Sequence, residues 1–360
     1  MRWVRRILVG LVVVVVLLAA AIRLTTFHPP AVATEAVTCP ADAPELESGQ
    51  SVEVMSWNVQ YMAGKDYVFW YDLFDESGPD ERPSSEAIAA TFDEVARVIN
   101  DEQPDIILLQ EVDDGAKRTD GEDQLARLLG MVSDAYACHA SAFYWKASFV
   151  PHPRILGSVG MKLSTLSRYR IDTAIRYELP QMPSDLLTRQ FDIRRAILET
   201  RLPVDGGDDL VVLNTHLDAF AQGTDTMQRQ VALTREHLDD LTDSGNPWVI
   251  GGDFNLLPPG RQYDDLTADQ QRYYEADTEL DVLTDTYDSV PSVDEANGPD
   301  RATWFTHFPN DPAADAPDRT IDFLFHAPTV TLGDHAVRSR DTLAISDHLP
   351  LVATYTLPDG

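Results

Sequence analysis

The sequence predicts an α/β domain in which two β-sheets are covered by helices on their outer faces, preceded by one apolar N-terminal helix. Three observations support this prediction. Strand-like and helix-like stretches alternate from residue 51 to the C-terminus. No internal repeat or second linker interrupts them, so we expect one domain at 51–360. The hydrophobic content of 44% and aromatic content of 9% are typical of a globular protein with a substantial core.

The first 27 residues form a segment of their own. The opening sequence MRWVRR is followed by the uncharged apolar run 7–22, a pattern that directs a chain to the export machinery and keeps the arginines inside. The run is short for a membrane span, but Leu24 and Phe27 extend it past Arg23. No convincing small-residue cleavage site follows. We therefore interpret 1–27 as a signal anchor or transmembrane helix, with a cleaved signal peptide and a secreted domain as the alternative. Both place the domain outside the cytoplasm.

Residues 28–50 are rich in Pro, Ala and Glu and show no apolar periodicity, which is typical of a tether. This segment contains Cys39, and the only other cysteine is Cys138. An oxidising compartment would permit a disulfide between them. The sequence does not show whether their Cα atoms approach closely enough, so a disulfide and two separate thiols both stay open.

The formal net charge of the chain is −31, and four of its 28 basic residues lie in the N-terminal segment, which contains no acid. The remaining 24 basic and 59 acidic residues give a balance of −35. Because such a field repels a polyanion, extended nucleic acid is a disfavoured partner. The alternative interpretation is a uniformly acidic surface that gives no information about the substrate. No protein partner is predicted.

In the first part of the domain, residues 52–59 predict a strand, which a long aromatic loop follows as far as residue 83. A helix begins near Ser84, because a serine cap precedes an apolar face spaced for a helix. Pro104 ends this helix, and the continuous apolar run at 105–112 predicts a buried strand. A short helix is expected at 124–132.

In the second part, the patterns predict a helix at 225–241 and strands at 158–167, 173–179, 194–202, 210–217, 248–255, 303–307, 320–326 and 351–357. Two stretches are interpreted as loops that either pack over the sheets or select the substrate: 60–83 and 143–157. The aromatic residues of 143–157, together with Lys146 and Arg154, also suit contact with a lipid surface.

Polar residues gather at the ends of these predicted strands: Asn58, Glu111, Asn214, His216, Asp253, Asn255, Asp322, Asp347 and His348. Any one alone is typical of a turn or cap. Together their oxygens are hard ligands suited to Mg²⁺ or Mn²⁺, and no cysteine cluster indicates a zinc site. Glu111 with Asn58 would hold a metal that polarises a phosphoryl oxygen. An imidazole beside an acid, as at His348, suits proton transfer or a contact to phosphate.

The motifs stand in the order SWN, LLQE, NTH, GGDFN, TID and SDH. This ordered set resembles the endonuclease/exonuclease/phosphatase superfamily, the metal-dependent hydrolases that include apurinic endonucleases, pancreatic-type DNases, bacterial sphingomyelinases and inositol polyphosphate phosphatases. The resemblance covers about 52–355. It implies a four-layer α/β/β/α sandwich and hydrolysis of a phosphate ester by direct attack of water.

The resemblance also implies roles for single residues. The metal ligands that it implies are Glu111, Asn58 and Asp347. The residues that it implies act on water and phosphate are His348, paired with Asp322, and Asp253, His216 and Asn255. Either His348 or Asp253 takes the proton, and one or two metal ions are possible.

Three further residues are candidates for binding the substrate. Arg195 lies where many members of the superfamily place an arginine on a strand near the site, and its alternative is an ordinary ion pair. Tyr136 and Tyr144 are candidates for a phosphate-facing tyrosine, and their alternative is packing. Histidines outside the motifs are expected on the surface or in packing: His139, His152, His237, His307, His326 and His335.

These observations favour a phosphoesterase, acting on a small or lipid-linked phosphate ester outside the cytoplasm and anchored by the N-terminal helix. An extracytoplasmic endonuclease or exonuclease acting on DNA is the alternative, which the charge weighs against. A non-catalytic binding module on the same fold is the second alternative. The sequence does not distinguish diester from monoester substrates.

Overall fold

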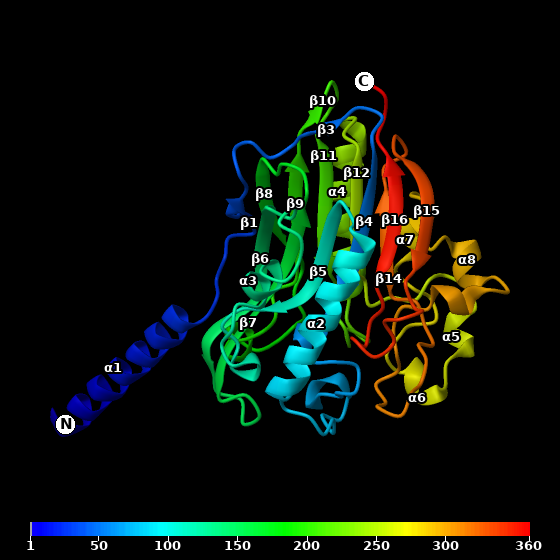
Figure 1. Ribbon diagram of the computed structural model, residues 1–360. Coiled ribbons are helices and arrows are strands. Elements are labelled where there is room, and N and C mark those ends of the chain that lie inside the picture. The colour runs from blue at the N-terminus through cyan, green and yellow to red at the C-terminus, as the bar shows by residue number, and fades with distance from the viewer. Residues whose placement is uncertain (1) are drawn as a thin grey trace.

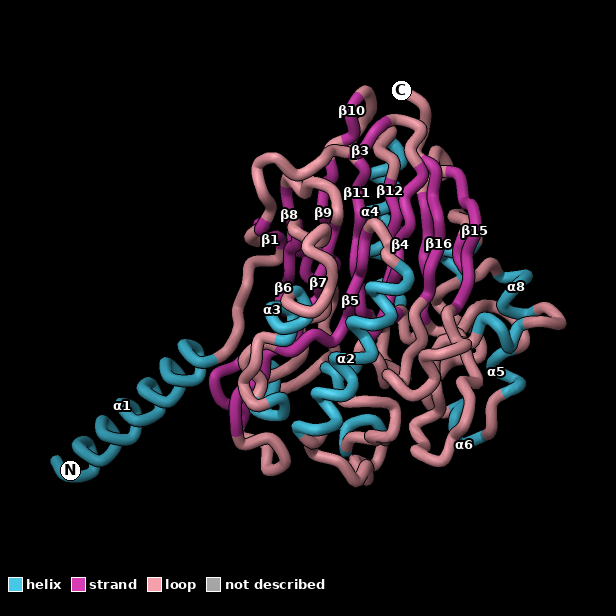
Figure 2. Tube along the Cα trace, in the orientation of Figure 1, coloured by secondary structure: helices cyan, strands magenta, loops and turns pink. Residues whose placement is uncertain are grey.

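The computed structural model describes residues 2–360, and it confirms the four-layer α/β/β/α sandwich (Figures 1 and 2). The first seven-stranded sheet contains, in spatial order, β15 (Thr331–Val337), β16 (Leu351–Thr356), β4 (Ser51–Asn58), β5 (Ile106–Asp113), β7 (Gly157–Ser167), β6 (Cys138–Val150) and β2 (Val37–Thr38). The second contains β1 (Val32–Thr34), β8 (Thr173–Glu178), β9 (Ala196–Leu202), β11 (Leu210–His216), β12 (Trp248–Asp253), β14 (Asp322–His326) and β13 (Ser289–Val290).

Each sheet is built around one parallel pair of strands joined by a long helix. Helix α2 (Ser85–Glu102) joins β4 to β5, and α4 (Thr226–Asp243) joins β11 to β12. The Ser84 hydroxyl accepts a hydrogen bond from Ala87 N at 3.1 Å, so it caps α2 as its position in the sequence predicts. Gln103 ends α2 in the left-handed conformation, directly before Pro104. The carboxyl ends of both parallel pairs lie at the lower edge of the molecule in Figure 1.

The remaining elements are short and lie in the connections. The helices are α3 (Gln124–Leu129), α5 (Gln262–Asp265), α6 (Ala268–Gln271), α7 (Asp281–Thr284) and α8 (Val293–Asn297). The 3₁₀ turns are η1 (Gln60–Met62), η2 (Trp70–Asp72), η3 (Lys117–Thr119), η4 (Thr188–Gln190) and η5 (Arg301–Trp304). A separate two-stranded sheet pairs β3 (Leu46–Glu47) with β10 (Val204–Asp205).

The two large sheets approach closely at β12. A Cβ atom on Gly251 would lie 2.5 Å from Cδ2 of Leu324 on the neighbouring strand and 2.8 Å from Cδ1 of Leu108 in the facing sheet, so these leucine side chains would have to shift. A buried polar contact also joins the sheets. Asn214 on β11 donates to the backbone oxygens of Leu109 and Ser164, both at 3.1 Å, and accepts from Gln110 Nε2 at 2.8 Å. Asn214 therefore ties the sheets together.

Two of the expected elements are wrong. The stretch 143–157 is not a loop throughout, because β6 extends to Val150 and pairs antiparallel with β7. Its side chains alternate between buried and partly exposed, but aromatic residues on both faces hide this period in the sequence. The predicted strand 303–307 is instead η5 followed by single bridges at His307. Strand β15 was not expected, because it is a mostly exposed edge strand with little apolar alternation.

The N-terminal helix α1 (Arg2–Thr25) projects away from the sandwich, and every one of its residues is at least partly exposed (Figure 1). By length and composition it is able to cross a membrane, although a signal sequence meets the same criteria.

Residues 28–50, which we expected to be a tether, are packed along the sandwich. Strand β1 pairs with β8 at the edge of one sheet, and β2 pairs with β6 at the edge of the other. A disulfide joins Cys39 to Cys138 at the start of β6, which resolves the alternative that the sequence left open. Short strands that add to exposed sheet edges need little apolar periodicity, so the composition of the segment does not reveal them.

Replacing both cysteines (Cys39→Ala with Cys138→Ala) should lower the free energy of unfolding by about 2–4 kcal/mol, because the bond closes a loop across 99 residues of sequence. Urea unfolding of both proteins would measure the difference. Reduction of the wild-type protein is the control, and it should reproduce the loss without affecting the double variant. Equal stability of oxidised and reduced wild-type protein would contradict the expectation.

Candidate active site

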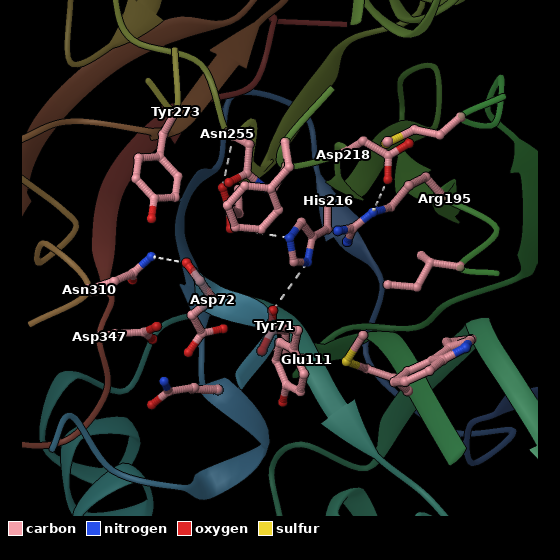
Figure 3. A pocket seen from close by; sticks show the side chains of 18 of the residues that line it. Tyr71, Asp72, Glu111, Arg195, His216, Asp218, Asn255, Tyr273, Asn310 and Asp347 are labelled. Atoms are coloured by element: carbon pink, nitrogen blue, oxygen red, sulfur yellow. Dashed lines mark hydrogen bonds and ion pairs between the residues drawn. The ribbon is translucent and has the colours of Figure 1, made fainter. Parts of the chain in front are cut away.

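The lower edge of the two sheets surrounds a pocket of about 510 Å³ (Figure 3). Side chains from both sheets and their connections line it at the positions where the sequence predicts a site: Glu111, His216, Asp253, Asn255, Asp347, His348 and Arg195. Asp322 lies directly behind His348. The structure therefore brings together residues that are as much as 237 positions apart in the sequence, from Glu111 to His348.

His348 and Asp322 form a buried pair that crosses between the sheets. His348 Nδ1 lies 2.8 Å from Asp322 Oδ2, and Trp57 Nε1 donates to the backbone oxygen of His348 at 3.0 Å. His348 Nε2 lies 3.5 Å from Asp253 Oδ2. Burial alone would lower the pKa of His348, but the Asp322 and Asp253 carboxylates raise it well above its usual range. The arrangement favours an imidazolium at this position.

The Asp253 carboxylate is held by donors from three directions. Its Oδ1 accepts from the backbone N–H of Asn255 at 2.9 Å, and its Oδ2 accepts from Asn58 Nδ2 at 3.1 Å. His216 Nε2 lies 3.3 Å from the same Oδ2. Burial raises the pKa of Asp253, because the charged form is poorly solvated there. Asp253 is thus a fixed carboxylate with a raised proton affinity, beside two imidazoles.

Glu111 reaches the pocket through an irregularity in β5. The register between β5 and β7 shifts between Leu109 and Val112, and Glu111 has a φ of 57° in the left-handed region. Such a bulge turns a side chain away from the direction that regular alternation would give it. A positive φ is costly for a residue with a Cβ atom, so the surrounding sheet must hold it in place.

Three carboxylates converge beside this bulge: Glu111, Asp347 and Asp72 (Figure 3). Burial and the neighbouring Asp347 raise the pKa of Glu111, and the same two causes raise the pKa of Asp72. Burial also raises the pKa of Asp347. Among residues 2–360, no lysine or arginine lies within ion-pair distance of any of the three. Half-buried, mutually repelling carboxylate oxygens without a lysine or arginine as an ion-pair partner fit a hard divalent cation.

The structure also groups carboxylate and imidazole atoms within 4.8 Å of one another in two sets that could hold a metal ion: His307, Asp347 and His348, and Asp253, Asp322 and His348. Asn58, implied as a ligand, does not line the pocket. Its Nδ2 donates to Asp253, and its Oδ1 accepts from Gln60 N at 3.0 Å. A metal role for Asn58 stays a prediction that depends on the second lone pair of Oδ1.

Arg195 lies across the pocket from the carboxylates of Asp72 and Asp347 in Figure 3. Its Nε donates to Asp218 Oδ1 at 3.1 Å, and Gln230 Nε2 holds the other oxygen of Asp218 at 2.8 Å. Arg195 Nη1 is buried and has no hydrogen-bond partner within the described chain. An unpaired guanidinium N–H is costly to bury, which suits a site that receives an anion.

The two candidate tyrosines have different surroundings. The Tyr144 hydroxyl lies 3.4 Å from His216 Nδ1, and the Arg195 guanidinium lies 5.4 Å from the Tyr144 ring centroid. Burial and then the Arg195 charge lower the pKa of His216 well below its usual range, so this imidazole is neutral. The prediction that Tyr136 faces the phosphate is wrong. Its hydroxyl donates to Pro104 O at 2.7 Å and its ring packs beneath α2, outside the pocket.

Several lining residues were not expected from the sequence: Asp72, Asp218, Tyr273, His307, Asn310 and Arg319. His307, which we expected on the surface or in packing, is buried, and its ring centroid lies 4.4 Å from that of His348. Asp72 is held within its own loop by Phe69 N, which donates to Asp72 Oδ2 at 2.6 Å, and from a distant loop by Asn310 Nδ2, which donates to Asp72 O at 2.7 Å. Asp218 stands two positions after NTH, and Arg319 stands two positions before Ile321 of TID. Their closeness to these motifs was a weak indication in the sequence that they line the site. Nothing in the sequence indicated that Tyr273 and Asn310 line the site.

The other half of the pocket is apolar and aromatic. Its lining includes Trp70 and Tyr71 of η2, Trp145 of β6, Met161 of β7 and Phe191. Residues 60–83, expected to pack over the sheets or select the substrate, supply the first two of these side chains and Asp72. The Arg118 guanidinium also lies there, paired with Asp113, and it donates to the Tyr71 hydroxyl at 2.7 Å. The pocket thus joins a charged end at the sheets to a mostly apolar end between the loops, which we call the apolar end.

Residues 55–348 match a family described as the Endonuclease/Exonuclease/phosphatase family. No curated protein sequence matches the chain. Among solved structures, an endonuclease/exonuclease/phosphatase from Beutenbergia cavernae DSM 12333 has a TM-score of 0.58 and 22% identity, covering 86% of this chain and 72% of its own. ANGEL2, described as a 2′,3′-cyclic phosphatase, has a TM-score of 0.54 and 17% identity, covering 85% and 96%. A family member from Bacteroides vulgatus has a TM-score of 0.51 and 15% identity, covering 86% and 99%. At these identities the structures share the fold.

Divalent cations should stabilise the folded protein through the three converging carboxylates. Mg²⁺ at about 100 times its Kd should add about 2.7 kcal/mol to the free energy of unfolding. Thermal unfolding with and without Mg²⁺ would measure the gain in wild-type protein, Glu111→Gln and Asp347→Asn. Both variants should unfold at a higher temperature than wild type without metal and should lose the gain. Asp269→Asn removes an exposed charge on α6 and is the control. An equal gain in all four proteins would contradict the assignment.

The stability of Glu111→Gln relative to wild type should depend on pH. Because the pKa of Glu111 is raised, its protonated form is favoured by the folded state, and that stability is lost as pH rises through the raised value. The advantage of the variant should therefore be small below about pH 4, where both states are protonated, and should grow above it. Metal-free urea unfolding across this range would measure it. A difference independent of pH would contradict the carboxylate repulsion.

Proposed function

The chain belongs to the Endonuclease/Exonuclease/phosphatase family, and on that premise we propose that it is a Mg²⁺- or Mn²⁺-dependent hydrolase that cleaves a phosphate ester by attack of water. The observation that carries the proposal is the single pocket in which the buried His348–Asp322 pair and Asp253 face the converging carboxylates. Most of these side chains lie at or beside the ends of strands β5, β12, β14 and β16, and a rigid sheet edge aims them at one volume.

The charged end of the pocket provides the residues that would bind the cation and the phosphate. Glu111 and Asp347 would hold the cation, with Asp72 adding a third negative charge beside it. When bound, the cation neutralises charge that develops on the phosphoryl oxygens. Two N–H donors are available to the same oxygens, His348 Nε2 from beside Asp347 and Arg195 Nη1 from the opposite side of the pocket.

Asp253 is the base that the geometry supports best. With Nδ1 held by Asp322, His348 is arranged as an imidazolium, which donates a proton and does not accept one. The Asp253 carboxylate then takes a proton from the attacking water as the new P–O bond forms. As the ester P–O bond breaks, His348 Nε2 gives its proton to the leaving oxygen. The 3.5 Å separation between Asp253 and His348 allows the proton to return and restore both groups.

The N-terminal part of the chain supports a location outside the cytoplasm. Helix α1 is able to span a membrane, and the arginines before its apolar run favour a cytoplasmic N-terminus. The Cys39–Cys138 disulfide supports an oxidising compartment for the rest. We propose a signal anchor at 1–27 and an exported catalytic domain at 51–360, to which residues 28–50 are bound by two edge strands and the disulfide.

The substrate we propose is a small or lipid-linked phosphate ester. The balance of −35 beyond the N-terminal segment opposes the close approach of a long polyanion. The pocket is only about 510 Å³ in volume, and the aromatic and apolar side chains of its apolar end provide contact surface for an apolar alcohol.

The full-length protein should hydrolyse a nitrophenyl phosphate ester in Mg²⁺ or Mn²⁺ and lose that activity in EDTA. His348→Ala and Asp253→Asn should each lower kcat by at least about 10²-fold, because each removes a proton-transfer group. His335→Ala is the matched control. It removes a histidine that lies 3.0 Å from a Glu295 oxygen outside the pocket, and turnover should stay the same. Full turnover in EDTA would refute the metal mechanism.

A further inference from the structure

Four large apolar side chains are exposed on two neighbouring segments at the apolar end of the pocket. Phe149 and Leu156 lie on the β6–β7 hairpin and are 48% and 53% exposed. Leu186 and Leu187 lie on the loop before β9 and are 82% and 59% exposed. We call these four side chains the apolar rim. Exposing this much apolar surface in water is costly, which indicates that something covers it.

The same two segments also line the pocket. The hairpin contributes Trp145 and Ile155 to the lining, and the loop contributes Met182 and Phe191. The segments are joined to each other, because Trp145 Nε1 donates to Phe191 O at 2.7 Å and both rings pack in one small apolar cluster. The apolar surface therefore continues from the rim into the pocket.

The exit of α1 is fixed to the same hairpin. Thr26, the residue directly after α1, forms an antiparallel bridge with Ala147 of β6. The Phe27 ring then packs edge-on against Phe143 with centroids 6.4 Å apart. Phe149 is only two residues beyond Ala147, which is about 7 Å along a strand. Figure 1 accordingly shows α1 and the β6–β7 hairpin projecting from the same corner of the molecule.

The hairpin carries a charge opposite to that of the chain as a whole. Lys146 and Arg154 are exposed on it, and residues 143–157 contain no acid, whereas the loop carries one exposed base and one exposed acid beside the leucines, Arg189 and Asp185. Basic side chains beside exposed leucine and phenylalanine are the composition expected where a protein meets anionic headgroups. A bilayer therefore fits this surface in both its apolar and its charged parts.

We propose that the apolar rim enters the outer leaflet of the membrane that α1 crosses, and that the pocket takes its substrate from that leaflet as a phospholipid. This inference rests on the proposed function and names its substrate class. The lipid phosphate would meet the cation held by the converging carboxylates and the N–H groups of Arg195, while its hydrocarbon part stays against Trp145 and Phe191. Because Thr26 is bound to β6, the pocket end of the domain is held at the bilayer surface.

The position of the rim can be measured without any activity. Full-length Phe149→Cys and Leu187→Cys, each carrying a polarity-sensitive fluorophore, are placed in vesicles containing phosphatidylglycerol. The native cysteines are paired and do not react. We expect a blue-shifted emission that an aqueous quencher does not reach. Val282→Cys, which is 41% exposed on α7, is the matched control and should stay accessible. Emission typical of an aqueous environment at both rim positions would contradict the insertion of the apolar rim into the bilayer.

A second measurement tests the substrate class. The Leu186→Ser/Leu187→Ser variant in the same vesicles should show a ratio of phospholipid to nitrophenyl ester hydrolysis at least about tenfold below that of wild type, because two apolar contacts with the bilayer are lost. Val282→Ser should keep the wild-type ratio. An unchanged ratio in the rim variant, or wild-type protein that cleaves the soluble ester and no phospholipid, would overturn the inference alone. Wild-type protein without any esterase activity would instead refute the proposed function, whatever the fluorophores report.

Discussion

The register between the two sheets is the constraint on which the rest of the molecule depends, and one buried amide has a central part in fixing it. Asn214 of the second sheet bonds to three groups of the first: two backbone oxygens and the Gln110 amide. Glu111 directly follows Gln110, and His216 lies two residues beyond Asn214 on the same face of β11. Each buried polar group left unpaired costs about 1–3 kcal/mol, so a shift of either strand against the other is strongly disfavoured. Packing adds to this, since Leu108 of the first sheet fills the space that a Cβ atom on Gly251 would occupy.

That rigidity permits strain where the chemistry needs it. Non-glycine residues with positive φ concentrate around the pocket: Gln60, Tyr61, Glu111, Phe220 and Asn255 all line it. A left-handed residue persists only where its surroundings hold it, and here the surroundings are two sheets bonded to each other. The same framework holds four carboxyl groups, the buried Asp253 and the half-buried Asp72, Glu111 and Asp347, at raised pKa values within one pocket. Such an arrangement lowers the free energy of unfolding of the metal-free protein. Binding of a cation would remove the repulsion and raise that free energy again.

The sequence predicts the framework better than the details of the pocket. Apolar periodicity and caps identify the parallel pairs and both long helices, and motifs at strand ends identify Glu111, Asp253 and His348. The bulge that turns Glu111 leaves no mark on local composition, because it is a property of pairing with β7. Asp72 and His307 come from irregular segments, where position follows tertiary contacts and no period exists to read. The sequence does not predict the edge strands in 28–50 for a similar reason, since two or three residues are too few for a periodic signal.

Those edge strands also impose an order on assembly. In a chain exported from its N-terminus, residues 28–50 emerge first, yet their partners β6 and β8 emerge about a hundred or more residues later. Until then, neither sheet has its terminal strand, and unpaired edges are the features through which newly made chains associate wrongly. Oxidation of Cys39 with Cys138 makes the closed edge permanent. The rate of this oxidation therefore limits how long the edge at β6 can reopen and pair with another chain.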